Sequence, residues 1–68
     1  MKKKILIKMC RDKDSKRKRK LFEYYRGYFD QGLSAKFTAD LINADLGEPL
    51  VTLYDIKYIR AHAAEWIG

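Results

Sequence analysis

The 68-residue sequence has little of several residue types that other classes of protein require. It holds one cysteine (Cys10), one proline and one histidine (His62). A single cysteine cannot form an internal disulfide, so the fold depends on packing and a reducing compartment is the default. Cys10 and His62 lie on distant segments, and no metal-ligand spacing, phosphate-binding glycine loop or carboxylate pair with a pocket occurs. We therefore expect no enzyme activity, no metal and no cofactor.

The sequence also lacks a long hydrophobic run. The short apolar stretch "KILIKMC" is broken by Lys8 and followed by "RDKDSKRKRK", which argues against both membrane spanning and export. A chain of this length forms one small core and leaves little room for a substrate cavity. We expect a cytoplasmic protein, nucleoid-associated if bacterial or phage, with no membrane partner and no small-molecule substrate.

Acidic residues are scarce where basic residues are dense. Residues 1–20 carry eleven Lys and Arg against two Asp, which gives +9. The other 48 residues carry four basic and seven acidic side chains, which gives −3 and a net charge of +6 for the chain. So dense a cationic cluster attracts polyanions, and nucleic acid is the commonest polyanion in a cell. The alternative is a solvated tail that only keeps the protein soluble.

Hydrophobic spacing predicts an all-α domain, residues 16–68, preceded by a basic N-terminal arm or short strand, residues 1–15. The stretch "KILIKMC" is short and contains β-branched residues, but a lone strand has no partner in this chain. Asp14 or Ser15 is expected to cap the helix that follows. That first helix is predicted to run from Lys16 to Gly32, with five apolar residues at helical spacing: Leu21, Phe22, Tyr25, Tyr28 and Phe29.

Two further helices complete the predicted three-helix bundle. The second begins after Ser34 and stops at Gly47. Its predicted apolar stripe consists of Leu33, Phe37, Leu41 and Ala44, and is widened by Ile42 and Leu46. The third begins at Thr52, which forms a capping arrangement with Asp55. The residues of this helix expected to face the core are Ile56, Ile59, Ala63, Trp66 and Ile67.

The stretch "GLSAKFTADLIN", residues 32–43, resembles the first helix of the helix-turn-helix unit in many bacterial and phage DNA-binding domains. In that unit a Gly-Leu-Ser entry leads into a helix with a small buried Ala, here Ala39, and an aliphatic residue three positions later, here Ile42. The stretch "VTLYDIKYIRAHA" resembles the recognition helix that follows. With the preceding helix, the resemblance covers about residues 19–67 and extends to the homeodomain-like domains of transposases, recombinases and small phage regulators.

Two features of the sequence depart from that pattern. Phe37 and Thr38 stand where the unit usually has a polar residue followed by a buried aliphatic one. The connection "ADLGEPLVT" is also longer than the shortest turns of the motif.

The resemblance implies a sequence-specific binder of double-stranded DNA, a small transcriptional or recombination regulator of phage or mobile-element type, with its third helix in the major groove. If Ile56 and Ile59 face the core, the opposite face presents residues at i, i+3, i+4 and i+7, the spacing that reaches base edges: Tyr54, Lys57, Tyr58 and Ala61. Thr52 at the helix start and Arg60 at its flank suit phosphate. A homodimer is expected, because one small module gives little specificity.

The basic run at the start of the first helix is expected to hold phosphates with strong salt dependence. It consists of Lys16, Arg17, Lys18, Arg19 and Lys20. Alternatively the outward residues of the third helix have no binding role: Tyr54 and Tyr58 only cover the core, and Lys57 is a solvated charge.

Two rival functions remain open from the sequence. One is a small interaction or inhibitor protein that binds a protein target through its Tyr-rich face, because tyrosine is favoured at interface centres. The negative balance of residues 21–68 favours this rival. The other is RNA binding through the basic arm alone.

Overall fold

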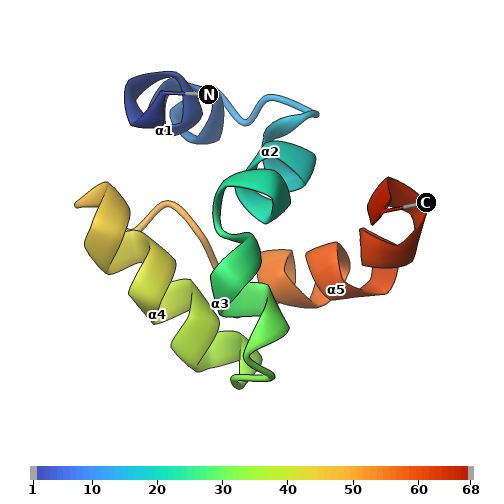
Figure 1. Cartoon of the computed structure of the whole chain (residues 1–68). Coiled ribbons are helices and arrows are strands. Elements are labelled where there is room, and N and C mark those ends of the chain that lie inside the picture. The colour runs from blue at the N-terminus through green and yellow to red at the C-terminus, as the bar shows by residue number, and fades with distance from the viewer. Residues whose placement is uncertain (1, 68) are drawn as a thin grey trace.

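The computed structural model describes residues 2–67, in which all regular secondary structure is helical, as the sequence predicts. Five helices replace the expected three (Figure 1): α1 (Lys3–Arg11), α2 (Arg17–Tyr24), α3 (Arg26–Asp30), α4 (Ala35–Leu46) and α5 (Leu53–Ile67). Helix α5 packs against both α4 and α2, and α1 packs against α2. The core therefore lies where α2, α4 and α5 meet.

The N-terminal segment is a helix, so the prediction of an arm or short strand is wrong. In α1, Leu6 and Cys10 lie one helical turn apart and are buried in the common core. The ion pair of Lys3 with Asp45 (3.3 Å) ties the start of the helix to α4, and that of Arg11 with Glu48 (2.6 Å) ties its end to the segment after α4. A strand without a partner leaves its backbone groups unpaired, whereas a helix satisfies them internally and still buries one apolar side.

The predicted first helix is interrupted at Tyr25, which separates α2 from α3. The backbone of Tyr25 has φ −106° and ψ 29°, outside helical geometry. Its ring is buried, and its hydroxyl donates a hydrogen bond of 2.7 Å to Asp45 Oδ2 of α4. Phe22, on the preceding turn, packs against both Phe29 and Trp66, with ring centroids 5.6 and 5.8 Å away. The interruption therefore lies where Tyr25 reaches α4.

The predicted ends of the last two helices are confirmed. Ser34 caps α4 by accepting a hydrogen bond from Phe37 N (3.1 Å), and Gly47 ends it with φ 82°. Glycine adopts that left-handed conformation without steric cost. At α5, Thr52 N donates to Asp55 (3.0 Å) and Asp55 N donates to the Thr52 hydroxyl (3.2 Å). This reciprocal pair is a capping box.

The buried face of α4 is only partly the predicted one. Phe37 is 51% exposed and Ala44 is also exposed. The buried residues are Thr38, Ala39, Ile42 and Leu46. Of these, Ile42 and Leu46 belong to the predicted stripe and Ala39 is the expected small buried residue, whereas a buried Thr38 is not expected from the sequence. In α5, Ile56 and Ile59 are fully buried as predicted, but Ile67 is 58% exposed and does not reach the core.

Candidate nucleic-acid interface

The face of α5 opposite the core carries an exposed ridge, defined by Tyr54, Lys57, Tyr58 and Ala61. Tyr54 is 73% exposed and Tyr58 45% exposed, and Lys57 and Ala61 are exposed as well. Tyr54 therefore does not cover the core. Tyr58 is partly covered, because its ring stacks on His62 with centroids 4.2 Å apart. The ridge has the arrangement that the sequence predicts.

Lys18 connects the start of α2 to this ridge. Its Nζ lies 4.0 Å from the centroid of the Tyr58 ring and 3.9 Å from Asp55 Oδ1. A cation over an aromatic face is attracted by the ring quadrupole, with about 0.5–1 kcal/mol at exposed sites. Residues forty positions apart in the sequence are thus brought together. The basic run and the ridge form one surface.

The five residues of the basic run have different surroundings. Arg19 and Lys20 both pair with Glu23 on the same helix, at 3.4 and 3.5 Å. Lys16 and Arg17 have no carboxylate within ion-pair distance among residues 2–67, and Arg17 Nη1 donates only to the Asp14 carbonyl (3.0 Å). The cations available to an external anion are therefore those at the very start of α2.

Arg60, expected at the flank of the ridge as a phosphate ligand, also has partners inside the protein. One nitrogen of its guanidinium donates to the Leu33 carbonyl and to the Thr38 hydroxyl (3.2 Å). Arg60 therefore ties α5 to the start of α4. The Thr52 hydroxyl is likewise engaged, by Asp55 N.

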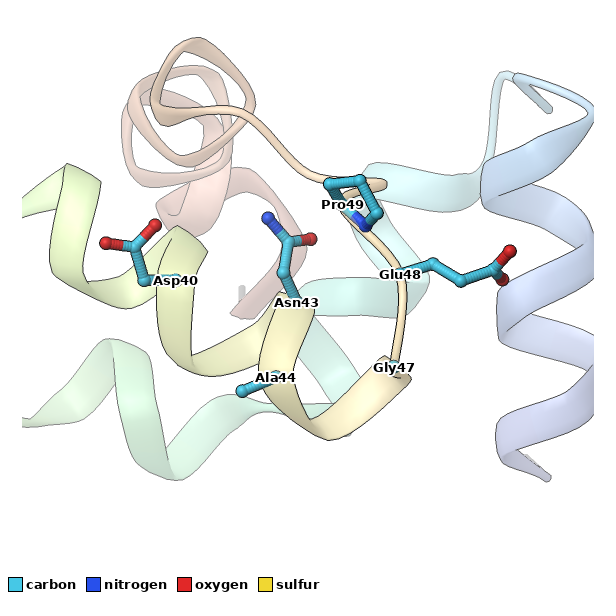
Figure 2. A pocket seen from close by; sticks show the side chains of 6 residues that line it. All are labelled: Asp40, Asn43, Ala44, Gly47, Glu48 and Pro49. Carbon is cyan, nitrogen blue, oxygen red and sulfur yellow. The ribbon is translucent and has the colours of Figure 1, made fainter.

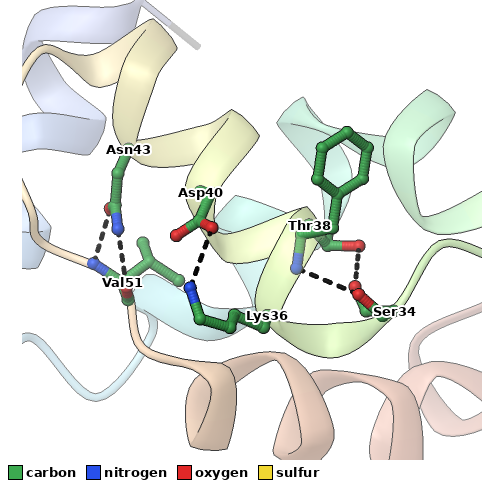
Figure 3. Close-up of polar contacts among 7 residues, drawn as sticks. Ser34, Lys36, Thr38, Asp40, Asn43 and Val51 are labelled. Carbon is green, nitrogen blue, oxygen red and sulfur yellow. Dashed lines mark hydrogen bonds and ion pairs between the residues drawn. The ribbon is translucent and has the colours of Figure 1, made fainter.

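Thr38 and Phe37 show how α4 accommodates its departures from the helix-turn-helix pattern. Thr38 occupies the buried position that an aliphatic residue usually fills, and Phe37 the exposed one. The buried Thr38 hydroxyl donates to the Ser34 carbonyl at 2.9 Å (Figure 3) and accepts from Arg60. Because a buried hydroxyl without partners is costly, this pairing explains why a threonine is stable there.

The ends of three helices meet around Cys10. Burial raises the pKa of its thiol, while the Arg17 charge lowers it and the Asp55 charge raises it. Cys10 lies near the end of α1, Arg17 begins α2 and Asp55 is in the first turn of α5. The raised pKa keeps the thiol protonated, which makes it a poor nucleophile.

The negative balance of residues 21–68 is largely neutralised by the N-terminal cations. Four of the seven acidic side chains in that range pair with residues 1–20. These four are Glu23, Asp45, Glu48 and Asp55. The acidic excess that favours a protein-binding function in the sequence therefore does not form a free acidic face.

Two open hollows lie on the surface. The larger, about 490 Å³, is lined by Asp40, Asn43, Ala44, Gly47, Glu48 and Pro49 (Figure 2). Its carboxylates are already paired, Asp40 with Lys36 and Glu48 with Arg11. The smaller, about 270 Å³, is lined by Tyr24, Tyr25, Gly27 and Tyr28 at the junction of α2 and α3. Neither contains an unpaired charged group.

Asn43 is the residue that sequence reasoning missed. Its amide oxygen accepts from Val51 N and its amide nitrogen donates to Val51 O, both at 2.8 Å (Figure 3). The only signal in the sequence is a polar residue next to the buried Ile42. These bonds fix the connection between α4 and α5, and with it the direction of the ridge.

Within residues 2–67, no group of three or more His, Cys, Asp or Glu is placed to hold a metal ion. No helix in this range has the length and apolar character needed to cross a bilayer. No protein-family model, curated protein or solved structure matches the chain.

Proposed function

We propose that the protein binds double-stranded DNA in a sequence-specific manner, as a small transcriptional or recombination regulator. The observation that carries the proposal is the continuity between the exposed ridge of α5 and the basic start of α2, which meet at Lys18 and Tyr58. An exposed helix face beside unpaired cations offers both base contacts and phosphate contacts.

In this mechanism α4 and α5 act as a helix-turn-helix pair and α5 enters the major groove. Lys57 donates to the acceptors of guanine, and Tyr54 packs on a thymine methyl or bonds a phosphate. Lys16 and Arg17 contact the sugar-phosphate backbone and supply affinity that is independent of sequence. Their position at the start of α2 opposes the helix dipole, and an anionic partner removes that cost.

The way α5 is held supports this role. Ile56 and Ile59 anchor its inner face, Arg60 ties it to α4, and Asn43 fixes the connection before it. A rigid recognition element loses little conformational freedom when it binds. A homodimer on two half-sites supplies the remaining specificity.

Titration against random duplex at two salt concentrations tests the proposal. Binding is expected to weaken steeply as salt rises, and an absence of binding at low salt removes the proposal. Lys57→Ala is expected to weaken preferred sites more than random DNA, by about 1–3 kcal/mol, whereas Arg17→Ala weakens both equally. Equal effects from the two variants contradict insertion of α5 into the groove.

The hollow at Tyr24, Tyr25 and Tyr28 supports a second function, binding of a protein target. Tyr25 and Tyr28 stack with centroids 5.6 Å apart, and Tyr24 is 40% exposed beside them. Tyr24 is the exposed member of this cluster, and tyrosine is enriched at interface centres. The variant Tyr24→Ala separates the two functions, because under the DNA proposal it leaves duplex affinity unchanged.

A further inference from the structure

We infer that the loop joining α1 to α2 is a second phosphate-binding element, in which Lys13 contacts the DNA backbone beside the duplex segment that α5 enters. The inference rests on the proposed function and adds a residue outside the basic run at the start of α2. Three observations carry it: the backbone conformation of Lys13, its unpaired charge and the position of its loop.

Lys13 has a backbone conformation that favours glycine. Its φ of 53° is the only positive φ of a non-glycine residue among residues 2–67. Asp14 N donates to Met9 O (2.9 Å) and Lys13 N donates to Cys10 O (3.3 Å), the two hydrogen bonds of a Schellman motif. The position held by Lys13 in that motif is usually glycine. A lysine there is strained, and such strain is typical of functional positions.

The ammonium group of Lys13 makes no ion pair within residues 2–67. Lys13 is exposed, and no carboxylate among residues 2–67 lies within ion-pair distance of it. Its neighbours differ: Lys8 pairs with Asp12 (2.9 Å) and Arg11 pairs with Glu48 (2.6 Å). A strained lysine without an internal partner indicates an external anion.

The position of the loop identifies that anion. It leads directly into Lys16 and Arg17, and Lys18 then reaches the Tyr58 ring of the ridge. A duplex held by α5 therefore passes close to three unpaired cations in five residues, Lys13, Lys16 and Arg17. Lysine acts on phosphate as a point charge and reads no sequence. The partner of the loop is the DNA backbone.

The test compares three variants of the full chain by duplex titration between 50 and 200 mM salt and by thermal unfolding. Lys13→Gln removes the charge and keeps the strain, whereas Lys13→Gly removes both. Lys36→Gln is the matched control, because it removes one equally exposed charge, from a lysine that pairs with Asp40 on α4. Each variant is titrated with two duplexes, one a preferred site and the other a random sequence.

Both Lys13 variants are expected to bind preferred and random duplex more weakly. The slope of log K against log salt should fall in magnitude by about 0.9. The factor by which a variant loses affinity between 50 and 200 mM salt should therefore be about 3.5 times smaller than for wild type. Lys13→Gly should also raise the melting temperature by about 3 °C, because strain is released. Higher stability with weaker binding is a combination that a merely structural lysine does not give.

The results that overturn the inference are distinct from those that overturn the proposed function. If wild type binds duplex but both Lys13 variants keep its salt slope, the loop makes no phosphate contact. If Lys36→Gln changes the slope as much as Lys13→Gln, the effect is one of net charge and the inference also fails. If wild type binds no duplex, the proposed function and the inference fall together.

Discussion

The side-chain amide of Asn43 holds the backbone of Val51 by two hydrogen bonds, both 2.8 Å long. Asn43 lies in the last turns of α4, and Val51 is a buried residue just before the cap of α5. These two bonds satisfy the N–H and the carbonyl of Val51. Without them, both groups would lack a partner in the six-residue connection between the helices. It therefore determines how α5 leaves the connection.

Replacement of this amide should destabilise the protein. In Asn43→Ala both Val51 groups lose their partners, and an unsatisfied group in a partly buried site costs about 1–3 kcal/mol. Asn43→Asp, although close in shape, should also destabilise, because a carboxylate oxygen then faces the Val51 carbonyl. Urea unfolding measures both. Lys36→Ala, on the exposed side of α4, is the control and should stay within about 0.5 kcal/mol of wild type. If Asn43→Ala unfolds at the same urea concentration as wild type, the Asn43 amide does not have this role.

The N-terminal helix should contribute to global stability. Leu6 is fully buried whereas the adjacent Ile5 is 53% exposed. Leu6→Ala should therefore lower the free energy of unfolding by about 2–5 kcal/mol, the usual cost of emptying a core site, and Ile5→Ala by much less. Chemical unfolding of the two variants makes the comparison. Equal effects would mean that the segment is an arm after all.

Arg60 should contribute more to the stability of the fold than to DNA affinity. Its guanidinium bonds the Leu33 carbonyl and the Thr38 hydroxyl, and hydrogen bonds to charged groups contribute about 1.5–3 kcal/mol each. We expect Arg60→Ala to unfold at lower denaturant. At a temperature where it is folded, its DNA affinity should fall less than that of Arg17→Ala. If Arg60→Ala instead loses more DNA affinity than Arg17→Ala, Arg60 contacts phosphate.

The contact between Tyr25 and Asp45 should make stability fall at both ends of the pH range. The Tyr25 hydroxyl and the Lys3 ammonium lower the pKa of Asp45, and burial, with the Asp45 bond, raises the pKa of Tyr25. Because the folded pKa of Asp45 lies below its unfolded value near 4, its contribution is present above about pH 4 and is lost as the pH falls further. Because the folded pKa of Tyr25 lies above its unfolded value near 10, its contribution is lost as the pH rises above about 10.

The difference in unfolding free energy between wild type and Tyr25→Phe isolates this contact. It should be largest at neutral pH and shrink toward both extremes. Urea titrations at a series of pH values measure it. A difference that does not change with pH would show that the hydroxyl contributes nothing to the two shifts.

Local signals in the sequence predict the last two helices well and the first two poorly. Ser34, Gly47 and the pair of Thr52 and Asp55 are caps whose hydrogen bonds involve only neighbours in the chain, and the structure confirms all of them. The helix over residues 3–11 instead buries Leu6 and Cys10 in the common core and pairs with Asp45 and Glu48, more than thirty residues away. The break at Tyr25 likewise accompanies a bond to Asp45. Such long-range contacts leave no local pattern to read.

The ridge could be predicted because it depends only on which side of α5 is buried. The contacts of Lys18 and Arg60 could not, because each joins helices whose relative placement the periodicity does not give. The isoleucines predict the outward face correctly. They do not predict that Lys18 of α2 lies against this face or that Arg60 bonds the start of α4.

Mapping the interface by NMR tests most sharply whether α5 enters duplex DNA beside the basic start of α2. Amide chemical shifts of the full chain are followed as a duplex selected from a random pool is added. The largest changes are expected in residues 52–61 of the α5 segment and in residues 13–18, with small changes around Tyr24 and Tyr28. Changes centred on the tyrosine hollow, or none at all with any duplex, would rule out groove insertion of α5.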